Sequence, residues 1–315
     1  MILIITNKED VTADYLCQNY LASESYLRID TDDLHAIEVH FDEGQFSLSH
    51  SRGKIEPSLI TGVWYRRPGR LVPPVAHSES AVNQLIVEEW TEAIEGFLEE
   101  IPFSRWVNHP CANIRASRKL HQLRVAVRAN LHVPATRLTM SSTEARHHME
   151  RHGRLVTKPL GTGMLLRETG ITQIYTSEVS GSALGADMQF GCPTLYQERI
   201  QKRVDVRVTV VDTEMVAVAI SSPDACGEQT LDIRQGMTTS AQYSKIDIPG
   251  DVARGIREIM AFYRLRFGAL DFAIDHQGRW VFFEINPNGQ WAWLDFEAGL
   301  HIGQALAVNL AAKEI

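Results

Sequence analysis

The chain has 315 residues, which is enough for two or three packed units. Its residues are 44% hydrophobic and 22% charged, as is typical of a globular protein. Its formal net charge of −8 argues against general binding of nucleic acid through phosphate neutralisation, so we expect no nucleic-acid partner. The four cysteines form no CxxC pair and no uncharged run approaches the ~18 residues of a membrane helix, so we expect no zinc site, disulfide framework or membrane partner.

The N-terminal segment MILIITNKED begins with a short apolar strand and lacks the basic region and long apolar core of a signal peptide. Together with the scattered cysteines, this favours a cytoplasmic protein. A helix and further strands follow, which predicts a small α/β unit over residues 1–105. The expected strands are 1–6, 26–29, 36–41, 45–50 and 62–66, and the expected helices are 11–22 and 78–101.

A second unit is expected over residues 106–193. One predicted helix, 113–130, carries Lys119. A predicted strand, 154–159, carries Lys158 directly before a glycine loop of sequence LGTG. The other expected elements are the strands 136–139, 165–167 and 171–176 and the helix 142–153.

A third unit is expected over residues 194–315. The predicted strands are 194–200, 204–211 and 215–221, and the predicted helices are 251–267 and 297–312, with a β-hairpin between these helices. The segment 224–237 is polar and rich in turn residues, and we expect it to face a substrate.

The C-terminal hairpin carries three oxygen-bearing side chains. Its strands are GALDFAID and RWVFFEIN, joined by a turn at Gly278. Glu284 and Asn286 are two residues apart on the second strand and therefore point to the same face, and the hairpin can bring Asp271 to that face. Two carboxylates and one amide oxygen in apolar surroundings suit Mg²⁺. The alternative is a strand with one polar edge and a solvated turn.

A phosphate-bearing substrate would need cations from outside the common phosphate loops, because the chain has no GxxxxGK[ST] and no GxGxxG between a strand and a helix. Lys158 lies in the apolar run LVTKPL, and the adjacent Gly161 and Gly163 allow main-chain N–H groups close to phosphate oxygens. Lys119 stands on a helix among arginines, where a solvated role is the alternative.

Two neighbouring strand ends can complete a nucleotide site. The segment YQERI, which contains Gln197, Glu198 and Ile200, can offer backbone groups to an adenine edge and a carboxylate to a ribose. On the following strand Arg207 shares a face with Asp205 and can clamp a γ-phosphate. The alternatives are an ordinary strand exit and a surface pair of Asp205 with Arg207.

The order of these groups, from Lys119 to the segment EINPNG, resembles that of the ATP-grasp superfamily of carboxylate–amine ligases over about residues 108–290. The resemblance implies an α/β (α+β) ATP-grasp fold with an N-terminal pre-ATP-grasp domain, a central domain and a C-terminal domain. It also implies ATP and Mg²⁺ as cofactors. The implied roles are phosphate binding by Lys119, Lys158, Gly161 and Gly163, contact with adenine and ribose by Gln197, Glu198 and Ile200, catalysis by Lys158 and Arg207, which also binds ATP, and Mg²⁺ binding by Asp271, Glu284 and Asn286.

Within this superfamily the chain is similar to the peptide-cyclising ligases of microviridin type, the graspetide synthetases. The similarity is carried by WYRRP (64–68), by an A-x-x-K-x-x-Q-L-x-x-A pattern around Lys119 and by EINPNGQWAW (284–293). It implies that ATP activates Asp or Glu side chains of a ribosomal precursor peptide as acyl phosphates, which Ser/Thr hydroxyls or Lys amines of the same peptide attack to form ω-ester or ω-amide rings. The precursor peptide, leader plus core, and a homodimer are the implied partners.

Three arginines and one aspartate are expected at the peptide. Arg66 and Arg67 precede a rigid Pro-Gly and are expected to bind substrate or phosphate, with a solvated strand end as the alternative. Asp232 and Arg234 resemble a D-x-R in the core-peptide site of the family, where an arginine orients the carboxylate that is activated. The leader segment is expected to meet either Arg199, Lys202 and Arg203 or the segment 224–237.

Two other functions fit part of this pattern. A ligase that adds free amino acids such as glutamate to a peptide or protein carboxyl would use the same activation, but its product gains the mass of an amino acid, whereas cyclisation loses water. A non-catalytic nucleotide-binding module would lack metal or phosphate ligands, and this sequence retains them all.

Overall fold

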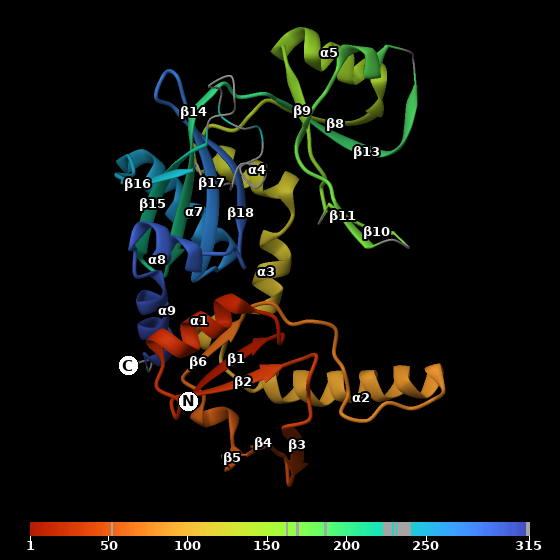
Figure 1. Cartoon of the computed structure of the whole chain (residues 1–315), viewed down its shortest axis with the longest axis vertical. Helices are drawn as coiled ribbons and strands as arrows, with labels where there is room; N and C mark the ends of the chain where they lie inside the picture. Colours follow the sequence, from red (N-terminus) through yellow and green to blue (C-terminus); the bar gives the residue numbers. More distant parts are fainter. Residues whose placement is uncertain are drawn as a thin grey trace.

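The computed structural model describes residues 1–51, 53–161, 163–167, 170–185, 188–222, 229, 231 and 241–312. The molecule is elongated, with an N-terminal unit at one end, a central unit at the other and a C-terminal sheet between them (Figure 1). Helices and strands are mixed along the whole chain, which confirms the expected α/β (α+β) class.

The N-terminal unit is built on a four-stranded parallel sheet with the strand order β2-β1-β6-β7. Its strands are β1 (Ile2–Thr6), β2 (Tyr26–Asp30), β6 (Gly62–Tyr65) and β7 (Trp106–Val107). A second, antiparallel sheet consists of β3 (Ile37–Asp42), β4 (Gln45–His50) and β5 (Gly53–Ile55). Every side chain of β1 is buried, as expected for a parallel strand that is covered on both faces.

The alternating side chains of β1 enter two different apolar cores. The helices that cover the sheet are α1 (Val11–Tyr20), α2 (Ser80–Glu99) and, from the far end of the chain, α9 (Ile302–Ala311). Ile2 and Ile4 belong to a core that includes residues of α1 and α9, whereas Leu3 and Ile5 belong to a core that includes residues of α2. The N-terminal unit therefore shares one of its cores with the C-terminal part of the chain.

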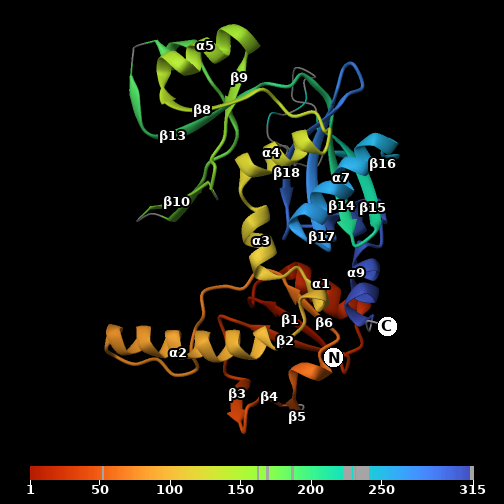
Figure 2. The same cartoon turned by 180° about the vertical axis from the view of Figure 1, so that it is seen from behind.

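The central unit is a four-stranded antiparallel sheet with the order β12-β9-β13-β8. Its strands are β8 (Thr136–Ser141), β9 (Leu155–Thr157), β12 (Ser177–Glu178) and β13 (Gln189–Glu198). Helix α5 (Ser142–His152) packs on this sheet around Ala145 and Tyr196. A separate hairpin of β10 (Met164–Arg167) and β11 (Gly170–Gln173) hangs from the central unit, which Figure 2 shows from behind.

The C-terminal sheet is antiparallel and has five strands in the order β16-β15-β14-β17-β18. Its strands are β14 (Lys202–Val211), β15 (Glu214–Ser221), β16 (Gln242–Ile246), β17 (Phe267–Asp275) and β18 (Trp280–Asn286). The helices beside it are α3 (Pro110–Ala116), α4 (Lys119–Arg128), α7 (Gly250–Tyr263) and α8 (Ala292–Ala298). Helices α3, α4 and α7 share the largest apolar core with β14, β17 and β18.

The structure corrects two expected boundaries. The helix expected over 113–130 is two helices, because the chain turns at Ser117 and Arg118 and α4 begins at Lys119. Both helices pack against the C-terminal sheet, although they precede the central unit in the sequence. The expected division between residues 193 and 194 falls inside β13, which pairs with β8 and β9, so the central sheet continues to Glu198.

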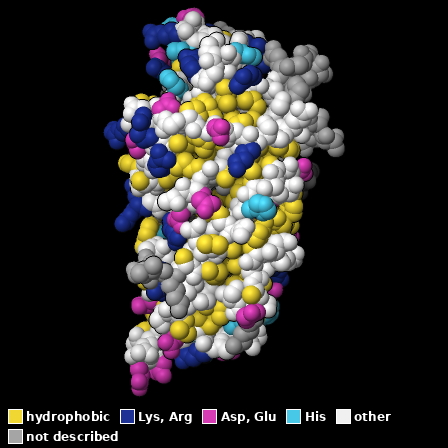
Figure 3. Space-filling view, turned by 90° about the vertical axis from the view of Figure 1, so that its left-hand side faces the viewer, with side chains coloured by type: hydrophobic (Ala, Val, Ile, Leu, Met, Phe, Trp, Pro, Cys, Tyr) yellow, Lys and Arg dark blue, Asp and Glu magenta, His cyan; other side chains and the backbone are white. Residues whose placement is uncertain are grey.

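Charge is unevenly distributed on one face of the molecule. On the face shown in Figure 3, Lys and Arg side chains gather towards the upper end, Asp and Glu reach the lower tip, and apolar side chains form a band between them. None of the described helices combines the length and the apolar character that a membrane crossing requires.

Candidate nucleotide and metal site

A cavity of about 640 Å³ lies where the central sheet, the C-terminal sheet and the end of β6 meet. Most of the residues expected to bind ATP, metal or substrate line it, although they come from distant parts of the chain. These are Arg67, Lys119, Lys158, Gly161, Gln197, Glu198, Ile200, Arg207, Asp271, Glu284 and Asn286. Asp232 and Arg234 lie outside the described residues.

The floor of the cavity is formed by three adjacent strands whose register brings the charged side chains together. Arg207 on β14 is opposite Asp271 on β17, and Asp271 is opposite Glu284 on β18. The Arg207 Nε donates to the Asp271 Oδ1 at 2.7 Å. The Asn286 Nδ2 lies 3.4 Å from both the Asp271 Oδ2 and the Glu284 Oε1. The three expected metal ligands therefore converge on one point.

Lysines compensate the negative charge of this floor. The Nζ of Lys119, the first residue of α4, lies 3.3 Å from the Glu284 Oε2. Burial acts to raise the pKa of Glu284, but Lys158 and Lys119 outweigh it and hold that pKa below its ordinary value. Burial raises the pKa of Asp271, an effect that Arg207 opposes and the Glu284 charge reinforces. Glu284 is thus the carboxylate that the surrounding cations keep ionised most firmly.

The donor set fits a hard cation that is shared with a phosphate-bearing ligand. Among the described residues, no group of three or more His, Cys, Asp or Glu side chains is placed to hold a metal ion. Asp271, Glu284 and Asn286 instead offer two carboxylates and, after a half-turn of the amide, one amide oxygen. Mg²⁺ commonly takes one or two carboxylates and fills its other positions with water and phosphate oxygens. Lys119 and Lys158 lie close enough to this point to act on the charge of Glu284.

The opposite wall of the cavity is formed by the ends of β9 and β13. Lys158 follows β9, and its Nζ lies 5.9 Å from the centre of the Phe283 ring. The Gln197 side chain is buried and donates to the Thr136 hydroxyl at 3.0 Å, so its amide positions the end of β13 rather than facing the cavity freely. Glu198 Oε2 accepts from the backbone N–H of Ala135 at 3.3 Å. This wall can offer main-chain groups and apolar surface to a base.

The two glycines of the LGTG loop differ in what they require. Gly163 has a φ of +70°, and an added Cβ would lie 3.0 Å from the backbone oxygen of Ile174. Gly161 has open space at that position within the described part of the chain, and of the two it is the one that lines the cavity. Gly163 therefore shapes the loop, while Gly161 leaves room for a ligand.

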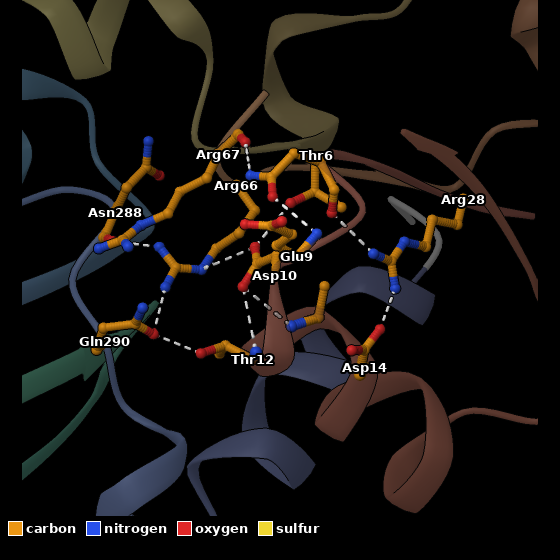
Figure 4. A network of polar contacts seen from close by, with 12 residues as sticks. Thr6, Glu9, Asp10, Thr12, Asp14, Arg28, Arg66, Arg67, Asn288 and Gln290 are labelled. Atoms are coloured by element: carbon orange, nitrogen blue, oxygen red, sulfur yellow. Dashed lines mark hydrogen bonds and ion pairs between the residues drawn. The ribbon is translucent and has the colours of Figure 1, made fainter. Parts of the chain in front are cut away.

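The adjacent arginines Arg66 and Arg67 face different surroundings. Arg67 lines the cavity, as expected for a substrate or phosphate contact. Arg66 is 1% exposed, and its guanidinium donates to the Asn288 backbone oxygen and, at 2.8 Å, to the Gln290 Oε1 (Figure 4). The expectation that Arg66 meets substrate is therefore corrected: successive side chains at a strand end point to opposite sides, and that of Arg66 points into the protein.

The loop after β18 also lines the cavity and is pressed onto β17. A Cβ at Gly289 would collide with the Cβ of Ala269. The Gly289 N–H donates to the Asn286 oxygen at 3.1 Å, and the buried Asn108 donates its Nδ2 to the Pro287 oxygen at 3.0 Å. The loop is thereby fixed relative to Asn286.

Gly289→Ala is expected to lower the free energy of unfolding by about 1–3 kcal/mol, because the new methyl group overpacks the contact with Ala269. Gly191→Ala on β13 is the matched control, since its added Cβ meets no described atom within 4 Å, and it should change stability by less than about 0.5 kcal/mol. Urea unfolding of both variants provides the measurement. Equal stability of the two would contradict the close contact between loop and strand.

One polar pair in the cavity was not predicted. The Lys202 Nζ lies 2.9 and 2.8 Å from the two carboxylate oxygens of Asp205, so Asp205 pairs with Lys202 and not with Arg207. Residues three apart on a regular strand point to opposite faces, but the pairing of β14 with β17 is irregular between Lys202 and Val204. Of the other basic residues expected to meet a leader, Arg199 pairs with Glu178 at 3.0 Å and Arg203 is exposed.

Comparisons with known proteins give matches among solved structures. No family model matches the chain, and the search of curated proteins gives no match either. The macrocyclase MdnC from Microcystis aeruginosa, bound with the precursor peptide MdnA, aligns with a TM-score of 0.78 and 22% identity over 98% of each chain. A Chryseobacterium gregarium RiPP-associated ATP-grasp ligase, in complex with ADP and a leader and core peptide, aligns with a TM-score of 0.81 and 24% identity over 98% of this chain and 96% of that one.

A third structure contains both a metal and a nucleotide. The ATP-grasp ligase PsnB, complexed with minimal precursor, Mg and ADP, aligns with a TM-score of 0.66 and 17% identity over 98% of this chain and 96% of that one. Each alignment spans the N-terminal, central and C-terminal parts together. The chain therefore has the ATP-grasp fold, in the form that these ligases and the macrocyclase share.

Proposed function

We propose that the chain is a graspetide synthetase, an ATP-dependent ligase that activates Asp or Glu side chains of a ribosomal precursor peptide and closes ω-ester or ω-amide rings within it. The observation that carries the proposal is the convergence of Asp271, Glu284 and Asn286 with Arg207 and Lys119 on the floor of one large cavity. Solved structures with this fold include complexes with ADP, Mg and precursor peptides, which supports the same classes of ligand here.

The first half of the reaction transfers the γ-phosphoryl group. A substrate carboxylate oxygen attacks the γ-phosphorus, and the bond from that phosphorus to the ADP oxygen breaks, giving an acyl phosphate and ADP. Lys119 and Lys158 would hold the phosphates, and Asp271, Glu284 and Asn286 would hold Mg²⁺, which supplies charge neutralisation on the phosphates when bound. Arg207, already oriented by Asp271, would lie against the charge that develops on the transferred group.

The second half closes the ring. A hydroxyl oxygen of Ser or Thr, or the amine nitrogen of Lys, attacks the acyl carbon and loses its proton, and inorganic phosphate leaves. Arg67, which lines the cavity, would orient an acidic side chain of the peptide, because a guanidinium can bind a carboxylate with two parallel hydrogen bonds. Asp232 and Arg234 stay in the proposal as substrate residues.

The experiment uses the full chain with ATP, Mg²⁺ and a candidate precursor rich in Thr or Ser and Asp or Glu near its C-terminus. We expect ADP release and a product lighter than the precursor by one water per ring in mass spectrometry. A precursor whose acidic core residues are replaced by Asn and Gln is the control and should remain unmodified. A product heavier by an amino acid would replace the proposal with the glutamate-type ligase, and binding without turnover would favour the nucleotide-binding module.

The proposal includes three less direct features. The chain divides into an N-terminal, a central and a C-terminal ATP-grasp domain, with the last two meeting after Glu198, where the central sheet ends.

The protein acts in the cytoplasm, in keeping with cysteines that form no disulfide at positions 17, 111 and 192. It forms a homodimer, which light scattering of the purified protein would detect as twice the mass of the chain.

A further inference from the structure

A buried arginine of the N-terminal unit holds the loop that follows the metal hairpin. The guanidinium of Arg66 has two partners on this loop, the Asn288 backbone oxygen and the Gln290 Oε1 (Figure 4). Its third neighbour is Asp10, whose Oδ2 lies 3.8 Å from the Arg66 Nε. Arg66 and Asp10 thus connect the N-terminal unit to loop residues that lie more than 220 positions after Arg66 in the sequence.

Burial of the Arg66 charge costs free energy, which argues against a role in stability alone. Burial lowers the pKa of Arg66 to about 10, while the Asp10 charge opposes that change. The Arg66 Nε lacks a hydrogen-bond partner among the described residues, and Asp10 is also engaged by the Thr6 hydroxyl and by the N–H groups that it caps at the start of α1. Replacing a buried charged pair with apolar side chains often stabilises a protein, so its use at this point favours a positioning role.

The loop after β18 connects Arg66 to residues on the floor of the cavity. Gln290 accepts from Arg66 through its side chain and from the Arg207 Nη1, at 3.1 Å, through its backbone oxygen. Thr12 at the start of α1 donates to the same Gln290 Oε1. Asn286, at the other end of the loop, accepts the Gly289 N–H on its backbone oxygen. A shift of the loop would therefore move both Arg207 and Asn286.

We infer that Arg66, with Asp10 behind it, is a positioning pair through which the N-terminal unit fixes the loop 287–290 and so sets Asn286 and Arg207 for the metal–nucleotide complex. The inference rests on the proposed function, because it assigns Arg66 an indirect role in the ATP reaction. Side chains that orient the direct ligands of a metal typically change its affinity about 10–100-fold when they are altered.

The test measures binding of ADP by calorimetry with and without Mg²⁺ in the full chain. Arg66→Lys keeps the charge but cannot reach both loop acceptors, and we expect it to weaken Mg²⁺-dependent ADP binding by about tenfold or more. Binding of ADP without Mg²⁺ should change less than about twofold. Asp10→Asn, which keeps a capping oxygen but removes the charge opposite Arg66, should act in the same direction without touching the loop.

Arg28→Lys is the matched control. Arg28 pairs with Asp14 and Asp30 inside the N-terminal unit and donates to the Asn7 oxygen, so its replacement removes comparable bonds away from the loop. If Arg66→Lys lowers the unfolding temperature but binds Mg²⁺–ADP as the wild type does, Arg66 is only structural and the inference is overturned. If Arg66→Lys does not fold, Asp10→Asn decides by the same comparison. Wild-type protein that binds no Mg²⁺–ADP would instead overturn the proposed function, and the inference with it.

Discussion

Glu284→Gln is expected to reduce ATP-dependent modification of the precursor by about three orders of magnitude while leaving the fold intact. Glutamine keeps the size of the side chain but loses the charge that a bound Mg²⁺ would share with Asp271. Coordination of this kind contributes several kcal/mol to a transition state with charge on phosphate oxygens, and each 1.4 kcal/mol is about tenfold in rate. The Lys119 Nζ, which lies 3.3 Å from the Glu284 Oε2, would also lose its charged partner and would be held less firmly in its present position.

ADP release at increasing Mg²⁺ concentration provides the measurement, with removal of Mg²⁺ by a chelator as the limiting case. Asn286→Ala should show the same loss, because it removes the third oxygen donor from the same point. Asp212→Asn is the matched control: Asp212 is an ion-paired carboxylate at the far end of the same sheet, held 2.7 Å from the Arg266 Nη2. Full Mg²⁺-dependent activity in both Glu284→Gln and Asn286→Ala would end the metal assignment.

The hairpin of β17 and β18 could be predicted from local periodicity, while the role of its polar side chains as metal ligands stays a prediction. Asp271 comes opposite Glu284 only through a register shift between Asp271 and Phe272, which the sequence does not show. The two-residue repeat that puts Glu284 and Asn286 on one face and the turn at Gly278 are visible in the sequence. Such signals lie within a few residues of the side chains they place. The order of lysines and carboxylates along the chain then pointed to the ATP-grasp fold, which the solved structures confirm.

Features that depend on distant partners could not be predicted. The sequence shows two arginines at 66 and 67, but which one is buried depends on acceptors at Asn288 and Gln290. The pair of Lys202 with Asp205 depends on an irregular register with β17, and strand periodicity alone would separate these residues. The position of Lys119 at the start of a second helix follows from a turn at Ser117 that has neither glycine nor proline to mark it.

Arg207→Met is expected to reduce the turnover number by about 10³-fold with a much smaller change in the KM for ATP. Arg207 is held by the Asp271 Oδ1 at 2.7 Å and by the Gln290 oxygen at 3.1 Å, so its guanidinium is oriented before any ligand binds. A preorganised cation acts most strongly where charge develops on the transferred phosphoryl group, and an arginine in that position contributes about 10³–10⁵ to turnover in other phosphoryl-transfer enzymes. An interaction made mainly in the transition state lowers the turnover number more than substrate affinity.

Arg207→Lys separates charge from geometry. Lysine keeps the positive charge but cannot bond the Asp271 carboxylate and the Gln290 oxygen with one planar group, so we expect it to recover only a small part of the lost turnover. Arg266→Lys, in the structural pair with Asp212, controls for the loss of an arginine–carboxylate pair on the same sheet and should retain wild-type kinetics. Steady-state rates of ADP release at saturating precursor distinguish these cases. A rise in KM for ATP without a fall in turnover would show that Arg207 binds the nucleotide before reaction and leaves stabilisation of the transferred group to the lysines.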